Sequence, residues 1–143
     1  MTRQGFSLIE LLVVIAIIAI LATTLVFPGA QSIRLRGYEM NAQSFGGLVY
    51  QKLNAYLTAR VIDTPSQVLA GWPRATAAPA GVPTDARDCN TPRPPLEGTS
   101  YGWDPAPSEV RCAVATTTTA GSEVFVVYTW VPGGRGKLYV AGQ

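Results

Sequence analysis

A single carboxylate, Glu10, stands inside an apolar segment near the start of the chain, in the stretch QGFSLIELLVVI. Every residue from 11 to 22 is apolar. A charge near the centre of a bilayer costs roughly 2.5–3.5 kcal/mol on insertion scales, so Glu10 requires a partner. Gly5 precedes the segment and has no side chain, so an extended backbone there can enter a protease cleft closely. The chemistry that these residues permit is peptide cleavage at Gly5 and an ion pair at Glu10.

Cleavage at Gly5 and the ion pair at Glu10 are connected. Cleavage after Gly5 would create a positive amine at Phe6, four residues before Glu10. Because residues four apart share one face of a helix, this amine could neutralise Glu10 of its own chain, or Glu10 of a neighbour packed with an axial stagger. Pairing lowers the cost of a carboxylate in lipid. Glu10 therefore favours association and sets the register of apolar packing that otherwise has no direction.

The usual reagents of enzyme active sites are scarce in this chain of 143 residues. It has no histidine, which excludes Ser-His and Cys-His nucleophiles and most zinc sites. Its two lysines, Lys52 and Lys137, are the candidates for a Ser-Lys dyad. The net charge of +2 is too small to indicate a nucleic-acid-binding surface by itself. The composition does not exclude an enzyme, but we expect a non-catalytic protein without a cofactor or metal.

The N-terminal segment is compatible with two ordinary interpretations. A cleaved secretory signal peptide would use Arg3 as its basic start and the residues around Pro28 as a weak cleavage site. An uncleaved membrane anchor also fits, because residues 6–27 would extend about 33 Å as a helix and span a bilayer. Neither interpretation gives a reason for Glu10, and the anchor does not explain the junction between Gly5 and Phe6.

A third interpretation accounts for both features. Gly5-Phe6-Ser7-Leu8-Ile9-Glu10 and the apolar run after it closely resemble the class III leader of type IV pilins and pseudopilins. In that family, a membrane-embedded prepilin peptidase cuts after the leader's glycine and methylates the new terminal amine, usually on Phe, and the fifth mature residue is Glu. The resemblance implies cleavage and N-methylation at Gly5 and Phe6 and an assembly role for Glu10. Beyond this segment the resemblance is architectural only.

The resulting division of the chain has three parts: a leader at 1–5, a transmembrane and assembly helix at 6–28, and a globular pilin domain at 29–143. A helix break is expected at Pro28 and Gly29, because proline removes a backbone donor and clashes with the preceding turn.

The globular domain is predicted to have an α+β fold. A helix is expected over 30–59, where apolar residues recur at spacings of three and four along one stripe. A capping box that begins at Thr64 predicts a short helix to Ala70 within a Pro-rich loop over 60–98. A small antiparallel sheet of three or four strands is expected to pack on the helix, within a meander over 99–143. Its strands are predicted at 99–103, 109–116, 122–131 and 137–141.

Several features of this domain leave alternatives open. Gly46 and Gly47 allow close approach either by the sheet or by a neighbouring molecule. Trp72, Trp103 and Trp130 are either core and subunit contacts or exposed binding aromatics.

The two cysteines, Cys89 and Cys112, would lie in an exported domain, where oxidising conditions favour a disulfide over two free thiols. A bridge between them would stabilise the fold by about 3.5 kcal/mol in the chain-entropy model. It would tie the long loop to the sheet. Pilins commonly carry a disulfide in this half, usually nearer the C-terminus.

The resemblance implies a structural subunit of a type IV pilus filament that serves motility, adhesion or DNA uptake. The subunit would cross the bacterial inner membrane once and then enter an extracellular filament of copies of itself. Its implied partners are membrane lipid, the prepilin peptidase, an inner-membrane assembly platform with its ATPase, and DNA or surfaces contacted through the filament. Alternatives are a minor pilin, a type II secretion pseudopilin, or a membrane-anchored binding module or enzyme from another class.

Overall fold

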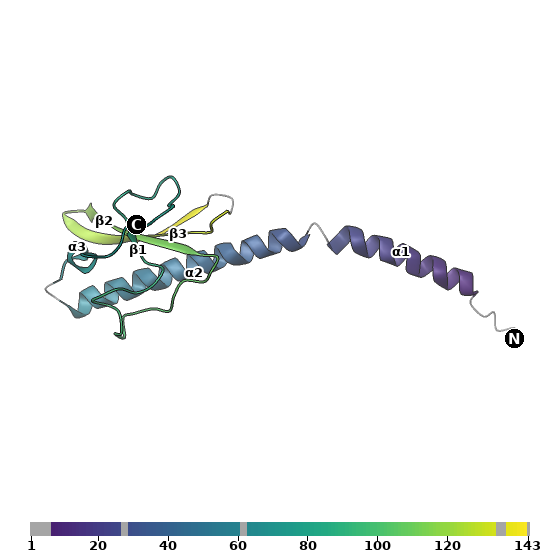
Figure 1. Cartoon of the computed structure of the whole chain (residues 1–143), viewed down its shortest axis with the longest axis horizontal. Coiled ribbons are helices and arrows are strands. Elements are labelled where there is room, and N and C mark those ends of the chain that lie inside the picture. Colours follow the sequence, from purple (N-terminus) through teal and green to yellow (C-terminus); the bar gives the residue numbers. More distant parts are fainter. Residues whose placement is uncertain (1–6, 27–28, 61–62, 134–136, 143) are drawn as a thin grey trace. The chain divides into compact units, whose positions relative to one another are not determined.

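A computed structural model of the chain describes residues 7–26, 29–60, 63–133 and 137–142 (Figure 1). At 24–26 and 29–32 it describes the backbone alone. The chain divides into two compact units, Met1–Arg36 and Gly37–Gln143. The boundary falls within a helix, and each unit is described by itself.

The first unit contains helix α1, Leu8–Val26. The helix begins after Ser7, whose carbonyl accepts hydrogen bonds from the N–H groups of Glu10 at 3.0 Å and Leu11 at 3.2 Å. Near the other end, the Thr23 hydroxyl donates to the Ile20 carbonyl at 2.8 Å. Helix α2 begins at Gly29. Residue 27 and Pro28 lie outside the described residues, so the helix break at Pro28 and Gly29 stays a prediction.

The second unit is built on the remainder of α2, which extends over Gly29–Ala59. The stripe predicted from the sequence is the side of α2 that faces the sheet. Within this unit it begins at Tyr38, which is half-buried. Its later members lie in the main hydrophobic core: Ala42, Phe45, Val49, Leu53 and Tyr56.

Four antiparallel strands form one sheet in the order β1-β2-β3-β4, which confirms the α+β class (Figure 1). Their bounds are Arg87–Asp88 for β1, Arg111–Thr119 for β2, Ser122–Trp130 for β3 and Leu138–Ala141 for β4. The β2–β3 hairpin closes through Ala120 and Gly121, with φ of 50° and 81°. Two successive positive φ values match the twist of the flanking strands, as in type I′ turns.

The strand predicted at 99–103 is wrong, because this segment forms turns in which Gly102 donates to the Thr99 carbonyl at 3.1 Å. The edge strand is instead β1, inside the segment expected to be a loop. Its two residues are too few to show a period-2 pattern, and it is held by long-range pairing with β2. The short helix α3, Pro65–Val68, forms where expected but ends earlier. Gln67 Oε1 accepts the Thr64 N–H at 2.8 Å, as a capping box requires.

Both faces of the sheet are covered. The α2 side holds the main core, whereas a smaller cluster on the other side contains Ala113, Ala115 and Trp130 and is covered by Ala75, Val82 and Ala86. All three tryptophans are buried, with exposures of 2% for Trp72, 7% for Trp103 and 6% for Trp130. The alternative of freely exposed binding aromatics is therefore wrong.

Candidate functional site

Large apolar side chains are exposed all around α1. Their exposed fractions range from 45% at Val14 to 80% at Leu8. They are Leu8, Ile9, Leu11, Leu12, Val13, Val14, Ile15, Ile17, Ile18, Ile20 and Leu21. A helix that is apolar on every side is normally buried, and an exposed apolar surface of this extent marks an interaction site. No described residue of the first unit covers this surface.

No helix in the described part of the chain combines the length and apolarity of a membrane span. The span expected from the sequence, 6–27, begins and ends at residues outside that part.

Glu10 lies in the first turn of α1 and is exposed. The positive end of the helix macrodipole stabilises a carboxylate at this position. Its side chain forms no hydrogen bond or ion pair with any residue that the structure describes. Gly5 and Phe6 lie outside the described residues, so cleavage, methylation and the pairing of Glu10 with an amine stay predictions.

The sequence alone did not predict that Glu10 lies in the first turn of α1. The signal was present in Ser7-Leu8-Ile9-Glu10, which has the Ser-x-x-Glu spacing of a capping box. The described residues do not form this box, because the Glu10 side chain makes no hydrogen bond with them, so the helix macrodipole alone favours Glu10 at the start of α1.

A second uncovered surface lies along α2, on the side away from the sheet. Within the second unit, Met40 is 71% exposed and Leu48 is 43% exposed. Gly37 and Gly47 lie on the same side at helical spacing, and a Cβ at either glycine would meet nothing within 4 Å. We name Gly37, Met40, Gly47 and Leu48, all in the second unit, the outer face of α2. Its small residues permit close approach by another helix.

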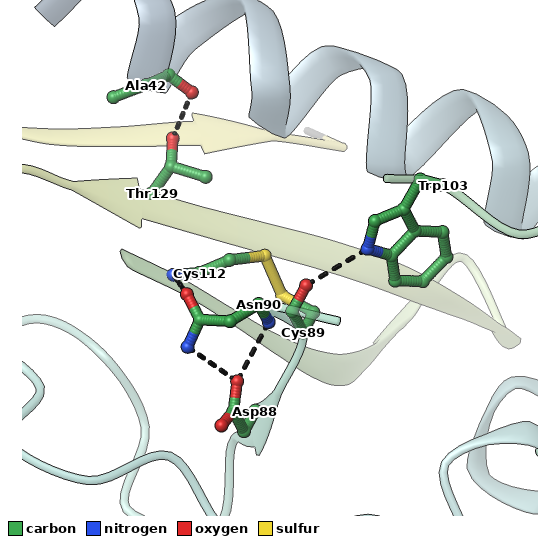
Figure 2. The surroundings of a disulfide bond; sticks show 7 residues. All are labelled: Ala42, Asp88, Cys89, Asn90, Trp103, Cys112 and Thr129. Carbon is green, nitrogen blue, oxygen red and sulfur yellow. Dashed lines mark hydrogen bonds between the residues drawn. A yellow bond between two sulfur atoms is a disulfide. The ribbon is translucent and has the colours of Figure 1, made fainter. Parts of the chain in front are cut away.

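The other glycine of the pair faces the sheet. A Cβ on Gly46 would lie 3.0 Å from Thr129 Oγ1 and 3.1 Å from Thr129 Cγ2 on β3. The Thr129 hydroxyl donates to the Ala42 carbonyl at 2.7 Å, and Thr129 is 1% exposed (Figure 2). The sequence left open whether the two glycines allow approach by the sheet or by a neighbouring molecule. Gly46 allows the close approach of the sheet, whereas Gly47 faces outward.

The disulfide expected from the sequence joins Cys89 to Cys112, with a Cα–Cα distance of 5.1 Å. Both residues are fully buried, at 0% and 1% exposed. It links the segment after β1 to β2, so the loop is tied to the sheet. The Trp103 indole N–H donates to the Cys89 carbonyl at 3.1 Å and packs this link against the core (Figure 2).

Asn90 continues the connection beyond β1. Its backbone N–H and its Nδ2 both donate to Oδ1 of Asp88, at 2.8 and 2.7 Å. Its Oδ1 accepts the Cys112 N–H at 3.0 Å (Figure 2). The amide of Asn90 therefore replaces a strand partner at the edge of β2 and fixes the orientation of the Asp88 carboxylate.

Two polar contacts complete the globular unit. Lys137 Nζ lies 3.3 Å from Glu39 Oε2, and this ion pair connects the start of β4 to α2. Because it is exposed to solvent, it contributes little to stability. At the end of α2, the Tyr56 hydroxyl donates to Asp63 Oδ2 at 3.1 Å. Burial and this hydrogen bond raise the pKa of Tyr56 above its ordinary value.

Residues 1–26 match the protein family described as the prokaryotic N-terminal methylation motif, which is the class III prepilin leader. Comparison of the chain with curated proteins and with solved structures found no match. The match is consistent with the type IV pilin family and contains Gly5, Phe6 and Glu10. It supports a type IV pilin or pseudopilin-like protein. Such proteins are generally structural rather than catalytic.

Proposed function

We propose that the chain is a structural subunit of a type IV pilus filament, on the premise that its methylation motif marks a pilin or pseudopilin-like protein. The observation that carries this proposal is the match over residues 1–26, in which a glycine-phenylalanine junction is followed by Glu10 and an apolar helix. Prepilin peptidase would cleave after Gly5 and methylate the amine of Phe6.

The exposed apolar side chains of α1 fit two environments in succession, the lipid bilayer and the core of a filament. Before assembly, residues 6–27 would lie in the bacterial inner membrane with the globular unit outside the cytoplasm. After assembly, the α1 helices of neighbouring subunits would bury the same side chains in the filament. Because apolar packing has little directional preference, an ion pair between Glu10 and the Phe6 amine of a neighbour would set the axial register.

The outer face of α2 supports further contact between subunits. Met40 and Leu48 are exposed apolar residues, and the open space at Gly37 and Gly47 permits helices to approach closely. An assembly platform in the inner membrane, powered by its ATPase, would add subunits to the filament. The completed filament would serve motility, adhesion or DNA uptake.

The test compares filament yield with processing in cells that express full-length variants. Glu10→Val should be inserted and cleaved normally, because the peptidase recognises the junction of Gly5 and Phe6, but its recovery in sheared filaments should fall sharply. Glu10→Gln retains the shape and loses the charge, so it separates electrostatics from packing. Ile15→Val is the matched control within the same helix and should assemble normally.

The measured quantity is the ratio of this subunit in sheared filaments to processed subunit in membranes. A normal ratio for processed Glu10→Val would contradict the assembly role of Glu10. Absence of the unmodified protein from sheared filaments would contradict the filament proposal as a whole.

A further inference from the structure

A cavity of about 660 Å³ lies on the face of the sheet that points away from α2. Its volume is within the range of small-molecule sites, roughly 300–1,000 Å³. One side is formed by the loop residues Ala75, Ala77 and Pro79, and the other by the ends of β2 and β3 with Pro132. Every one of these residues belongs to the second compact unit.

Strand register brings three polar side chains to this cavity. Arg111 on β2 is the direct partner of Trp130 on β3, and Asp88 on β1 is the partner of Ala113, two residues beyond Arg111. Partners in an antiparallel pair, and residues two apart in a strand, share one face of the sheet. Asp88, Arg111 and Trp130 all line the cavity.

The Trp130 indole has an unused donor. A buried indole N–H is normally hydrogen-bonded, as it is in Trp72, which donates to the Pro94 carbonyl at 2.8 Å, and in Trp103. Trp130 is only 6% exposed, and its N–H donates to no residue that the structure describes, but it is not among the described side-chain atoms that are both shut off from solvent and unpaired. Trp130 lines the cavity, where a ligand could accept a hydrogen bond from this N–H.

Asp88 and Arg111 each use some of their polar atoms in hydrogen bonds to described residues and leave the others unused. Asp88 Oδ1 accepts both bonds from Asn90, while its Oδ2 accepts none from a described residue (Figure 2). Arg111 Nη1 donates to the carbonyls of Ser108 at 3.2 Å and Val110 at 3.1 Å. The other two nitrogens of Arg111 have no partner within the described ranges, and the two opposite charges do not form an ion pair with each other.

These groups select the class of ligand. A simple anion would be repelled by Asp88, a simple cation by Arg111, and an apolar molecule would displace water from the polar groups without replacing its hydrogen bonds. A polyhydroxylated ring can donate to Asp88 Oδ2, accept from Arg111 and Trp130, and place its C–H groups against Ala75, Ala77 and Pro79. We propose that this cavity binds a sugar ring through Asp88, Arg111 and the indole N–H of Trp130.

The test uses the full chain, with ¹⁵N-labelled tryptophan, in a detergent that has no sugar headgroup. The probes are methyl glucoside, methyl galactoside and N-acetylglucosamine at millimolar concentrations. At least one should shift the indole N–H signal of Trp130, assigned through Trp130→Phe, while the signals of Trp72 and Trp103 stay in place. Those two unchanged signals also report that each variant is folded.

Asp88→Asn retains the acceptor for Asn90 and replaces Oδ2 by a donor, and Arg111→Gln removes the charge. Each should weaken sugar binding by about tenfold or more, because hydrogen bonds to charged groups are lost. Glu97→Gln removes an exposed carboxylate that does not line the cavity, so it should leave binding unchanged.

Absence of a shift with all three sugars would overturn the proposal. Equal affinity in all the folded variants would also overturn it, and so would a shift produced by free serine in place of the sugars, which would identify a zwitterion site. Filament yield from Asp88→Asn and Arg111→Gln should be normal, so failure of sugar binding and failure of assembly are measured separately.

Discussion

Replacement of Gly46 by alanine tests the closest contact between α2 and the sheet. The new Cβ would lie 3.0 Å from Thr129 Oγ1 and 3.1 Å from its Cγ2. Thr129 is β-branched and stiff, and it cannot rotate away without loss of the 2.7 Å hydrogen bond to Ala42. Overpacking of this kind lowers the free energy of unfolding by about 1–3 kcal/mol. The higher helix propensity of alanine than of glycine raises it by about 1 kcal/mol. We expect the free energy of unfolding to fall by about 1 kcal/mol.

Gly47 supplies the matched control in the same helix. A Cβ there meets nothing within 4 Å, so Gly47→Ala gains helix propensity without a clash. We expect it to raise the free energy of unfolding by about 1 kcal/mol. Because the propensity contribution is common to both variants, their difference of about 1–3 kcal/mol measures the overpacking alone.

The assay is urea unfolding of the full chain in mild detergent, followed by tryptophan fluorescence. Trp72, Trp103 and Trp130 are all buried in the globular unit and report its unfolding. In a Thr129→Ala background the clash is removed, so Gly46→Ala should lose most of its cost. Equal stabilisation by Gly46→Ala and Gly47→Ala would refute the proposed contact with Thr129.

Two further predictions concern stability. Replacement of both Cys89 and Cys112 by alanine opens a link with a sequence separation of 23, and should lower the free energy of unfolding by about 3.5 kcal/mol; an unchanged urea midpoint would contradict this. Burial raises the pKa of Tyr56, so the folded state holds this proton more tightly than the unfolded state. The stabilisation is complete below the ordinary tyrosine pKa of 10.0 and is lost as the pH rises above it. The measurement is the free energy of unfolding as a function of pH. Above pH 10.0 it should decline less steeply in Tyr56→Phe than in the unmodified protein. Identical slopes would show that burial of Tyr56 does not change its pKa.

The helical half of the fold could be predicted because its signals are local. The stripe from Ala42 to Tyr56 repeats at helical spacing and became the buried face of α2. The capping box at Thr64 likewise depends on neighbours within four residues. The disulfide followed from a count of two cysteines in a domain that was expected to be exported, and the pairing is present.

The edge strand and the cavity could not be predicted because they depend on long-range register. Asp88 becomes a strand residue through its pairing with Ala113, and no periodic pattern precedes that contact. Arg111 and Trp130 are opposite each other because the hairpin turns at Ala120 and Gly121. A one-residue slip would move both side chains to the other face, so only the folded register identifies the site.

The most direct test of the filament account is the intact mass of the protein recovered from sheared surface filaments. The account predicts a chain that begins at Phe6, carries one methyl group on its terminal amine, and has Cys89 and Cys112 joined. A chain recovered with Met1 to Gly5 still attached, or one that begins near Gln31 after signal-peptide cleavage, would contradict it.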